Sequence, residues 1–321
     1  MSHLWVLAIA LVADALVGDP PALWRRIPHP VVMIGAVIGL GDRTLNRASD
    51  PGARRRILGT VFVTALLVAA LALGLVLTAL FSAMPFGWLG TLLVVTVLLA
   101  GRSLFDHVSA VARALDRGLD DARSEIAHIV GRDPESLDGP AIARAGIESL
   151  AENFSDGVVA PAFWFAVLGL PGLLAYKALN TADSMIGHRS ARHRDFGRAA
   201  ARLDDAANYI PARLSGLLVA LAAPLAGGHP VRAFRIMGDD APSHRSPNAG
   251  WPEAAMAGAL NVALAGPRRY AGTVVRDPFL NSGGNPAPSS ADVRRALRVY
   301  IGANLELLAL AAALAGLVQL F

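Results

Sequence analysis

Residues 142–161 read IARAGIESLAENFSDGVVAP, and residues 177–213 read KALNTADSMIGHRSARHRDFGRAAARLDDAANYIPAR. Both stretches are rich in polar residues, whereas long parts of the chain around them are strongly apolar. Ionisable side chains between apolar segments are costly in a membrane and usually mark functional positions. We therefore expect the fold to be organised around this polar region, residues 142–213, and its chemistry to lie there.

Three groups of polar residues recur in the polar region at spacings typical of a helix face. The first group is Arg144, Glu148, Glu152 and Asp156. The second is Asn180, Asp183, Ser184, Gly187 and His188, and the third is Arg202, Asp204, Asp205, Asn208 and Arg213. Clustered carboxylate and amide oxygens are the ligands that Mg²⁺ prefers, with waters and substrate phosphates completing its shell. The alternative is three solvated helix faces held by ion pairs.

The composition indicates an integral membrane protein. Of the 321 residues, 54% are apolar and only 17% are charged, and the mean hydropathy is +0.47. The net charge of +4 does not call for nucleic acid, because the arginines lie beside apolar segments, as in cytoplasmic loops of membrane proteins. The absence of cysteine excludes disulfides, thiolate catalysis and cysteine-ligated metals.

Several apolar runs predict membrane spans. The run 57–81 is the clearest, and a turn at 82–87 joins it to a second run at 88–100, so their arginine-bearing ends should face the cytoplasm. The run 4–17 is short and contains Asp14, which we expect to face protein. A helix capped by Ser290 or Asp292 should lead into a last span at about 301–321.

Other segments predict helices that do not cross the membrane. Residues 102–137 are amphipathic and should lie at the cytoplasmic interface. Two apolar arms, 161–170 and 173–179, are joined by Pro171 and Gly172, which favours a re-entrant hairpin, since a crossing would leave the arginines of 189–202 outside. Residues 214–226 could likewise form either a re-entrant segment or a full crossing of the membrane. Small residues at 252–264 suit close helix packing, and 281–290 should be a loop.

We therefore predict an all-α fold, namely a polytopic integral membrane helical bundle with amphipathic interfacial helices and re-entrant segments. The whole chain, residues 1–321, should form a single membrane-embedded domain, because it shows no internal repeat and no second soluble region.

Common catalytic motifs are absent. The chain has no P-loop, and its only lysine, Lys177, follows Leu-Ala-Tyr. It also lacks the H-E-x-x-H and G-x-S-x-G patterns of zincins and α/β-hydrolases. Asn180-x-x-Asp183 and Asp204-Asp205 match only part of the aspartate motifs of membrane prenyltransferases and phosphatidyltransferases.

Seven blocks, in order along nearly the whole chain, resemble the CobD/CbiB family of cobalamin biosynthesis, the adenosylcobinamide-phosphate synthases. The blocks are Gly18-Asp19-Pro20, His29-Pro30-Val31, GRDP at 131–134, ESLAENFSDGVVAP at 148–161, NTADSMIG at 180–187, ARLDDAANYIPAR at 201–213 and SPNAGWPEAAMAGAL at 246–260. The connector 188–195 departs from the family pattern, with His188 and His193 where tyrosine is expected.

The resemblance implies amide formation between adenosylcobyric acid, a corrinoid, and aminopropanol or its O-phosphate, with ATP as co-substrate and Mg²⁺ as cofactor. We expect a multi-pass protein of the bacterial inner membrane, surrounded by the lipid bilayer. The arginines of the polar region and the short arms around Pro171 and Gly172 predict that the active site lies on the cytoplasmic side. Assembly as a homo-oligomer or with other enzymes of the corrinoid pathway stays open.

We assign roles on the combined basis of the residue types and the resemblance. Asp183, Asp204 and Asp205 are the expected Mg²⁺ ligands, with Asn153 and Asn180 orienting substrate. Glu148, Glu152 and Asp156 are expected to act as a base, to support the metal ligands or to replace them. The expected phosphate contacts, since a guanidinium matches phosphate oxygens, are Arg189, Arg192, Arg202 and Arg213.

Two other functions are compatible with a polytopic membrane fold. A transporter should contain two corresponding halves with broken helices, which the sequence does not show. The second alternative is a corrinoid-binding or signalling protein, because the chain also resembles a regulatory membrane protein of β-lactamase induction that shares the family's fold. Such a sensor would have no need of three acidic groups.

Overall fold

The computed structural model describes residues 2–20, 24–129, 134–188, 190–270, 273–275 and 277–320. Most of these residues are helical, which confirms the all-α prediction. The α-helices are α1 His3–Val17, α3 Pro30–Leu45, α4 Gly52–Ser82, α5 Trp88–Leu98, α6 Gly101–Arg117, α7 Leu119–Ile126, α8 Gly139–Phe154, α9 Ala160–Ile186, α10 Arg198–Ala207, α11 Tyr209–Leu221, α12 Pro230–Asp240, α13 Gly250–Leu260 and α14 Ser290–Val318.

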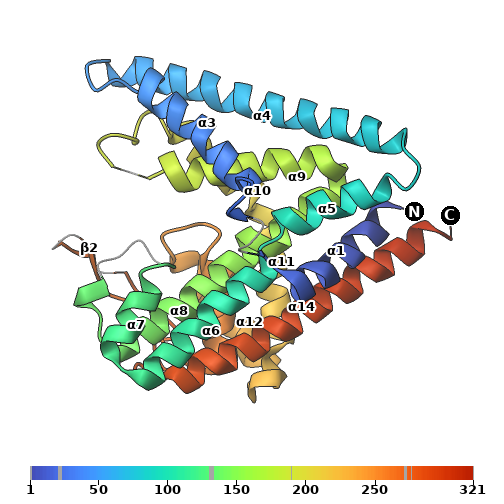
Figure 1. Ribbon diagram of the computed structural model, residues 1–321. Coiled ribbons are helices and arrows are strands. Elements are labelled where there is room, and N and C mark those ends of the chain that lie inside the picture. Colours follow the sequence, from blue (N-terminus) through green and yellow to red (C-terminus); the bar gives the residue numbers. More distant parts are fainter. Residues whose placement is uncertain are drawn as a thin grey trace. The chain divides into compact units, whose positions relative to one another are not determined.

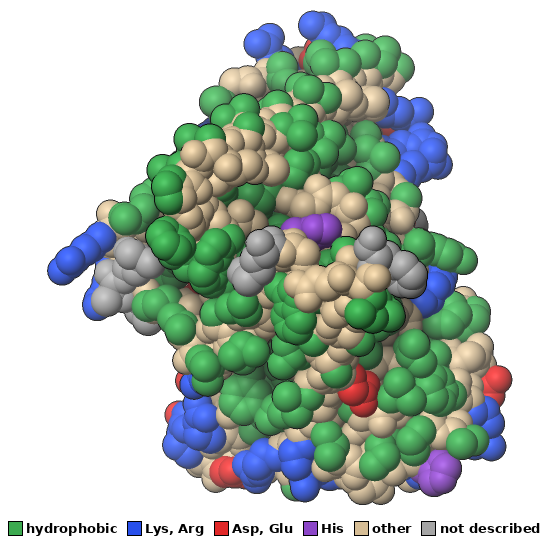
Figure 2. Space-filling view, turned by 90° about the vertical axis from the view of Figure 1, so that its right-hand side faces the viewer, with side chains coloured by type: hydrophobic (Ala, Val, Ile, Leu, Met, Phe, Trp, Pro, Cys, Tyr) green, Lys and Arg blue, Asp and Glu red, His purple; other side chains and the backbone are tan. Residues whose placement is uncertain are grey.

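The helical segments Gly52–Ser82, Trp88–Arg117, Gly139–Ile186 and Ser290–Val318 are each long and apolar enough to cross a membrane. The chain is therefore a multi-pass membrane protein. Only 11% of the apolar window of α4 is buried inside the protein, as expected for a helix that faces lipid. Hydrophobic side chains are spread widely over the face shown in Figure 2, whereas Lys and Arg side chains lie mainly at its edges. Asp14 on the short helix α1 is buried, which confirms that it faces protein.

The chain divides into two compact units, which are described separately below. The first unit comprises Met1–Ala100, Ala160–Asn208 and Ala311–Phe321, and the second comprises Gly101–Val159 and Tyr209–Leu310. Each unit has its own hydrophobic core. The expectation that 1–321 forms one domain stays a prediction.

The first unit is built on α4 and α9, which lie side by side in Figure 1. Its core is formed by buried side chains of α3, α4, α9 and α10 with the loop before α10, including Ile38, Val63, Ile186 and Phe196. Phe196 also stacks on Phe62, with the ring centres 6.0 Å apart. This packing holds the end of α9 and the start of α10, both in the polar region, against two membrane-associated helices.

Helix α9 folds back on itself at Gly169. The backbone there has φ 64° and ψ −150°, a conformation that in practice only glycine adopts. Beyond the bend, the carbonyl oxygen of Trp164 occupies the space that a Cβ on Gly172 would need, so the two arms pack closely. The predicted fold-back between the two apolar arms is therefore present, and the second arm continues as helix through the polar residues up to Ile186. That the hairpin is re-entrant stays a prediction.

The second unit contains the predicted amphipathic region. Its helix is interrupted at Gly118, which has φ 157°, so α6 and α7 pack as two helices, with buried residues such as Val111 and Ile126, against Ile142 of α8. The sequence pattern predicted one continuous amphipathic region and missed this break. On α13, Gly258 lies close against Ala233 of α12, which confirms the close packing expected from small residues.

Short elements interrupt the helices. A π-helix, Ser155–Val159, separates α8 from α9, and 3₁₀ turns lie at Pro134–Ser136, Ala223–Ala226 and Ala241–Ser243. Two antiparallel strand pairs join β1 Leu264–Ala265 to β4 Phe279–Leu280 and β2 Arg268–Tyr270 to β3 Thr273–Val275. The sequence analysis predicted neither the strands nor the π-helix, since each is too short to produce a hydrophobic period.

Candidate active site

The predicted site residues belong to both units. The first unit contains Asn180, Asp183, Arg192, Arg202, Asp204 and Asp205, whereas the second contains Glu148, Glu152, Asn153, Asp156 and Arg213. Arg189 lies outside the described residues. We describe the acidic group of the first unit first, because it contains all three expected metal ligands.

Asp204 is the most buried member of the acidic group, with 7% of its surface exposed. It lies on α10 and accepts a hydrogen bond of 2.9 Å at Oδ2 from the side-chain amide of Asn208. Its other oxygen, Oδ1, is buried and has no hydrogen-bond partner. A buried carboxylate oxygen without a partner is costly, so this atom is suited to a ligand.

Asp183 lies on the last turn of α9, where the chain leaves the helix at Gly187. The Oδ1 atom of Asp183 occupies the space that a Cβ on Gly187 would need. The backbone N–H of Gly187 also donates to the Asp183 carbonyl at 2.7 Å. Glycine at 187 therefore allows the Asp183 carboxylate to lie against the backbone.

The three aspartates are close enough to interact electrostatically. Burial, with a smaller contribution from the negative charge of Asp183, raises the pKa of Asp204 to about 7, although the nearby side-chain amides of Asn208 and Asn180 oppose the change. Asp205 adds to this repulsion. A bound proton or cation would relieve it.

The donor chemistry of this group fits Mg²⁺. Asp183, Asp204 and Asp205 offer hard carboxylate oxygens, and Oδ1 of Asp204 is a buried acceptor without a partner. Within the described part of the chain, no three His, Asp or Glu side chains are arranged to coordinate a metal by themselves. A magnesium ion here would therefore keep waters or take oxygens from a phosphate. The three-aspartate ligand set stays a prediction.

Two aromatic residues position the end of α10. Tyr176 donates a hydrogen bond of 2.9 Å from its hydroxyl to Oδ1 of Asn208, and both side chains are buried. Trp164 donates from Nε1 to the carbonyl of Ala207 at 3.2 Å. Our sequence assignments did not include Tyr176, although it lies four residues before Asn180 and seven before Asp183, and so on the same helix face.

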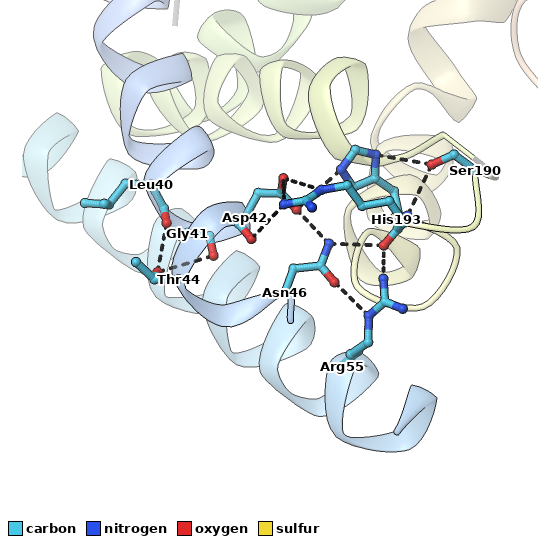
Figure 3. A network of polar contacts seen from close by, with 9 residues as sticks. Leu40, Gly41, Asp42, Thr44, Asn46, Arg55, Ser190 and His193 are labelled. Atoms are coloured by element: carbon cyan, nitrogen blue, oxygen red, sulfur yellow. Dashed lines mark hydrogen bonds and ion pairs between the residues drawn. The ribbon is translucent and has the colours of Figure 1, made fainter. Parts of the chain in front are cut away.

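Arg192, one of the predicted phosphate contacts, is engaged within the protein. Its guanidinium forms an ion pair of 2.8 Å with Asp42 of α3, while half of the side chain stays exposed. The carbonyl of Arg192 accepts hydrogen bonds from Asn46 and Arg55, two side chains that lie close together in Figure 3. Arg202 is exposed on α10. A phosphate role for either arginine stays a prediction.

In the second unit, the carboxylate of Glu148 accepts a hydrogen bond from the protein backbone. Its Oε1 accepts a hydrogen bond of 2.7 Å from the N–H of Ala265, and the side chain is 3% exposed. One turn earlier, Arg144 donates to the carbonyls of Ala263 and Pro286. These two residues of the first polar group thus hold β1 and the loop before α14, a structural role that the sequence analysis did not predict.

The other predicted residues of the second unit's acidic stretch lie just before the π-helix or within it. Glu152 and Asn153 are exposed on the last turn of α8, and Asn153 donates to the carbonyl of Ser149 at 2.9 Å. Asp156 lies within the π-helix, where the turn contains an extra residue, so the regular four-residue spacing from Arg144 does not extend to it. π-Bulges often occur at functional sites. The catalytic assignments of Glu152, Asn153 and Asp156 stay predictions.

Arg213 is held between two aromatic rings. Its guanidinium lies 3.5 Å from the ring centre of Tyr209 and 4.4 Å from that of Trp251. Nη1 donates to the Tyr209 carbonyl at 2.7 Å and lies 3.4 Å from Oδ1 of Asn248. The stacking fixes the plane of the guanidinium, which leaves a pre-oriented group suited to bind an anion.

The family model described as CobD/Cbib protein matches residues 7–300. The chain belongs to the CobD/CbiB family. Nearly all the elements described above, including the acidic group of α9 and α10, lie within the matched range. The resemblance inferred from the seven sequence blocks is therefore confirmed.

Curated relatives within the CobD/CbiB family are similar over nearly their whole length. The chain is 52% identical over 299 residues to the protein of Brucella suis biovar 1 named Cobalamin biosynthesis protein CobD, covering 92% of this chain and 91% of the relative. Proteins of the same name from Sinorhizobium sp and Rhodobacter capsulatus are 52% and 49% identical, and each match covers 94% of this chain and at least 93% of the relative. No solved structure matches the chain.

Proposed function

We propose that this CobD/CbiB protein acts in cobalamin biosynthesis as an ATP- and Mg²⁺-dependent ligase. It would join a carboxylate of adenosylcobyric acid to the amine of aminopropanol or aminopropanol O-phosphate. The pathway is supported by relatives of about 50% identity whose shared name gives that pathway. The reaction class is what the resemblance to the CobD/CbiB family implies, and the acidic group of α9 and α10 supports the use of Mg²⁺ in that reaction.

The observation that carries the proposal is the buried, partnerless Oδ1 of Asp204 beside two further aspartates. Acidic side chains near one another in a membrane protein destabilise the fold unless a proton or a cation binds there, and Mg²⁺ is a cation suited to carboxylate oxygens. Phosphoryl transfer from ATP uses Mg²⁺ to neutralise the charge on the phosphates. Asp183, Asp204 and Asp205 would hold this ion.

The reaction needs an activated acyl group, because a carboxylate is a poor acyl donor. An oxygen of the substrate carboxylate attacks the γ-phosphorus of ATP, the bond to the bridging oxygen breaks, and ADP leaves. The amine nitrogen then attacks the acyl carbon, inorganic phosphate leaves, and the nitrogen loses a proton to a base. No cysteine exists in the chain to carry a covalent acyl group.

The residues of the chain would bind and orient the reactants. Arg213, with its plane fixed by two rings, is suited to a phosphate group of ATP or of the amine substrate. Asn180 lies near Asp204 and would orient the carboxylate. By residue type and family resemblance alone, Glu152 and Asp156 stay the candidates for the base that takes the proton from the amine. We further propose that the site opens to the cytoplasm, where ATP is available.

The proposal is tested with the purified full-length protein in lipid nanodiscs. Adenosylcobyric acid, Mg·ATP and aminopropanol phosphate are added, and the corrinoid product is identified by mass spectrometry. We expect a product heavier by the amine substrate minus one water, and none when ATP is omitted. Folded protein that yields no amide with either amine would refute the ligase assignment.

Isotope labelling tests the activation step separately. With ¹⁸O in the reacting carboxylate, we expect one labelled oxygen in inorganic phosphate and none in the nucleotide. Label in AMP would show adenylation instead. Label retained in an enzyme ester would show that a side chain of the protein is the nucleophile.

A further inference from the structure

Seven arginines gather at the end of α4 that precedes its apolar run. They come from the last turn of α3 and the residue after its C-cap, from the first turns of α4, and from the loop between α9 and α10. We call this set the arginine cluster, and its members are Arg43, Arg47, Arg54, Arg55, Arg56, Arg192 and Arg194. All belong to the first unit, and all except the half-buried Arg55 are exposed.

A hydrogen-bond network holds the three segments together. Asn46, which follows α3, donates to Asp42 at 2.6 Å and to the carbonyl of Arg192 in the loop at 3.1 Å. Arg55 of α4 donates to Oδ1 of Asn46 at 2.7 Å and also to the carbonyl of Arg192. Figure 3 shows these contacts converging from α3, α4 and the loop. The arginines are therefore presented from a fixed framework.

The cluster contains more positive charge than its own acids neutralise. Asp50 pairs with Arg54 at 3.1 Å, Asp195 with Arg56 at 2.7 Å, and Asp42 with Arg192 at 2.8 Å. The other four arginines make no ion pair with an acidic residue in the described ranges. Seven arginines and three aspartates thus leave an excess of four positive charges.

The cluster lies at the polar end of a membrane span. The apolar run of α4 starts at Ile57, directly after Arg56, and the side chain of Ile57 is 65% exposed. Hydrophobic side chains of α4 such as Val61 and Val68 are also exposed along the helix. The guanidinium groups are therefore at the level where the hydrocarbon of the bilayer gives way to the headgroups.

We propose that the arginine cluster binds the headgroups of anionic phospholipids in the membrane around α4. The phosphate of such a lipid matches the guanidinium fork, and its acyl chains would lie along the exposed apolar side chains of the same helix. Arg47 and Arg194, which form no close ion pair in the described ranges, would make the main contacts. The surface is distinct from the acidic group on which the proposed function rests.

The test uses the full-length protein purified in a nonionic detergent. Phosphatidylglycerol or phosphatidylcholine is added in mixed micelles, bound lipid is counted by native mass spectrometry, and the unfolding temperature is recorded. We expect phosphatidylglycerol to bind and to raise the unfolding temperature more than phosphatidylcholine does. The difference should shrink as NaCl is added, because the contacts are electrostatic.

Paired variants locate the site. The double variant Arg47→Gln with Arg194→Gln should lose about fivefold in affinity for phosphatidylglycerol per arginine removed. The matched control is Arg235→Gln with Arg245→Gln, which removes two exposed arginines of the second unit, and it should bind like the wild type. Equal affinity in both double variants would overturn the proposal. So would equal stabilisation by inorganic phosphate alone, which would indicate a small-anion site.

Discussion

The side-chain amide of Asn208 donates a hydrogen bond of 2.9 Å to Oδ2 of Asp204, and both residues are buried. Oδ1 of the same asparagine accepts a hydrogen bond from the hydroxyl of Tyr176. One amide thus connects the predicted metal ligand on α10 with the second arm of α9. Loss of either hydrogen bond should therefore lower the stability of this part of the first unit.

We expect Asn208→Ala to destabilise the folded protein by about 1–3 kcal/mol, because it leaves two buried polar groups without a partner. Tyr176→Phe, which removes only one of the two hydrogen bonds, should cost less, about 1 kcal/mol. Tyr209→Phe is the control, since that ring is exposed and stacks on Arg213. The measurement is the unfolding temperature in detergent. Equal values for Tyr176→Phe and Tyr209→Phe would contradict the role given to Tyr176.

Substitutions in the acidic group test the proposed metal site. Asp183→Ala, Asp204→Ala and Asp205→Ala should each lower the rate of amide formation by at least about 100-fold, since a metal ligand contributes several kcal/mol to the transition state. Asp239→Ala, an exposed aspartate of α12, should leave the rate unchanged. The readout is product formation at saturating Mg·ATP, with folding checked by circular dichroism. Near wild-type rates in all three variants would rule out these ligands.

The bend of α9 depends on glycine. Gly169→Ala should destabilise the protein by about 1–3 kcal/mol, because the φ and ψ angles of Gly169 are strained for any residue with a Cβ. The matched substitution is Gly238→Ala in α12, where a Cβ meets open space in an ordinary helical conformation, and there we expect a small stabilisation. The measurement is the unfolding temperature of the two variants compared with that of the wild type. A neutral effect at 169 would mean that the bend tolerates other conformations.

The absence of natural cysteines permits a labelling test of topology. We expect Ala191→Cys and Ala206→Cys, both at exposed positions, to be protected from a membrane-impermeant thiol reagent added to intact cells. Met84→Cys, in the turn between α4 and α5, should be labelled under the same conditions. Permeabilised cells should show labelling at all three positions. Labelling at 191 and 206 from outside would reverse the proposed orientation.

Asp42 gives an expected dependence of stability on pH. Burial raises the pKa of this carboxyl, but hydrogen bonds from Asn46, Arg192 and His193 outweigh burial and hold the pKa below its model-peptide value of 3.8. A lowered pKa in the folded state contributes stability that is present above pH 3.8 and is lost as the pH falls through the folded pKa. Asp42→Asn should therefore flatten the loss of stability below pH 3.8, whereas Asp120→Asn, at an exposed site of α7, should not. The measurement is the unfolding temperature of the wild type and both variants at several pH values above and below 3.8.

The sequence predicted long elements well because burial in lipid requires long apolar runs. The run 57–81 corresponds to α4, the short run with Asp14 to α1, and the last span to the end of α14. The fold-back near Pro171 was also predicted, since proline and glycine interrupt an apolar segment there. The break at Gly118 was missed, because glycine occurs inside many helices and the amphipathic period continues across it.

The candidate site was predictable only as a set of residue types. Helical spacing placed Asp183 on one face of a helix and Asp204 on another, but it could not reveal which oxygen lacks a hydrogen-bond partner. Glu148 illustrates the difficulty, because its partner is the N–H of Ala265, 117 residues further along the chain. Contacts of that kind arise from tertiary packing, which a local pattern of residues does not encode.

The two arms of α9 each reach the end of α10 with one hydrogen bond, from Trp164 to Ala207 and from Tyr176 to Asn208. Asp183 lies on the second of these arms, and Asp204 lies one turn before Asn208. The bend at Gly169, both arms and the end of α10 therefore form a closed loop of contacts. A change in the angle of the bend would strain one of these two hydrogen bonds, so Gly169, which lies outside the acidic group, contributes to holding the end of α10 in place.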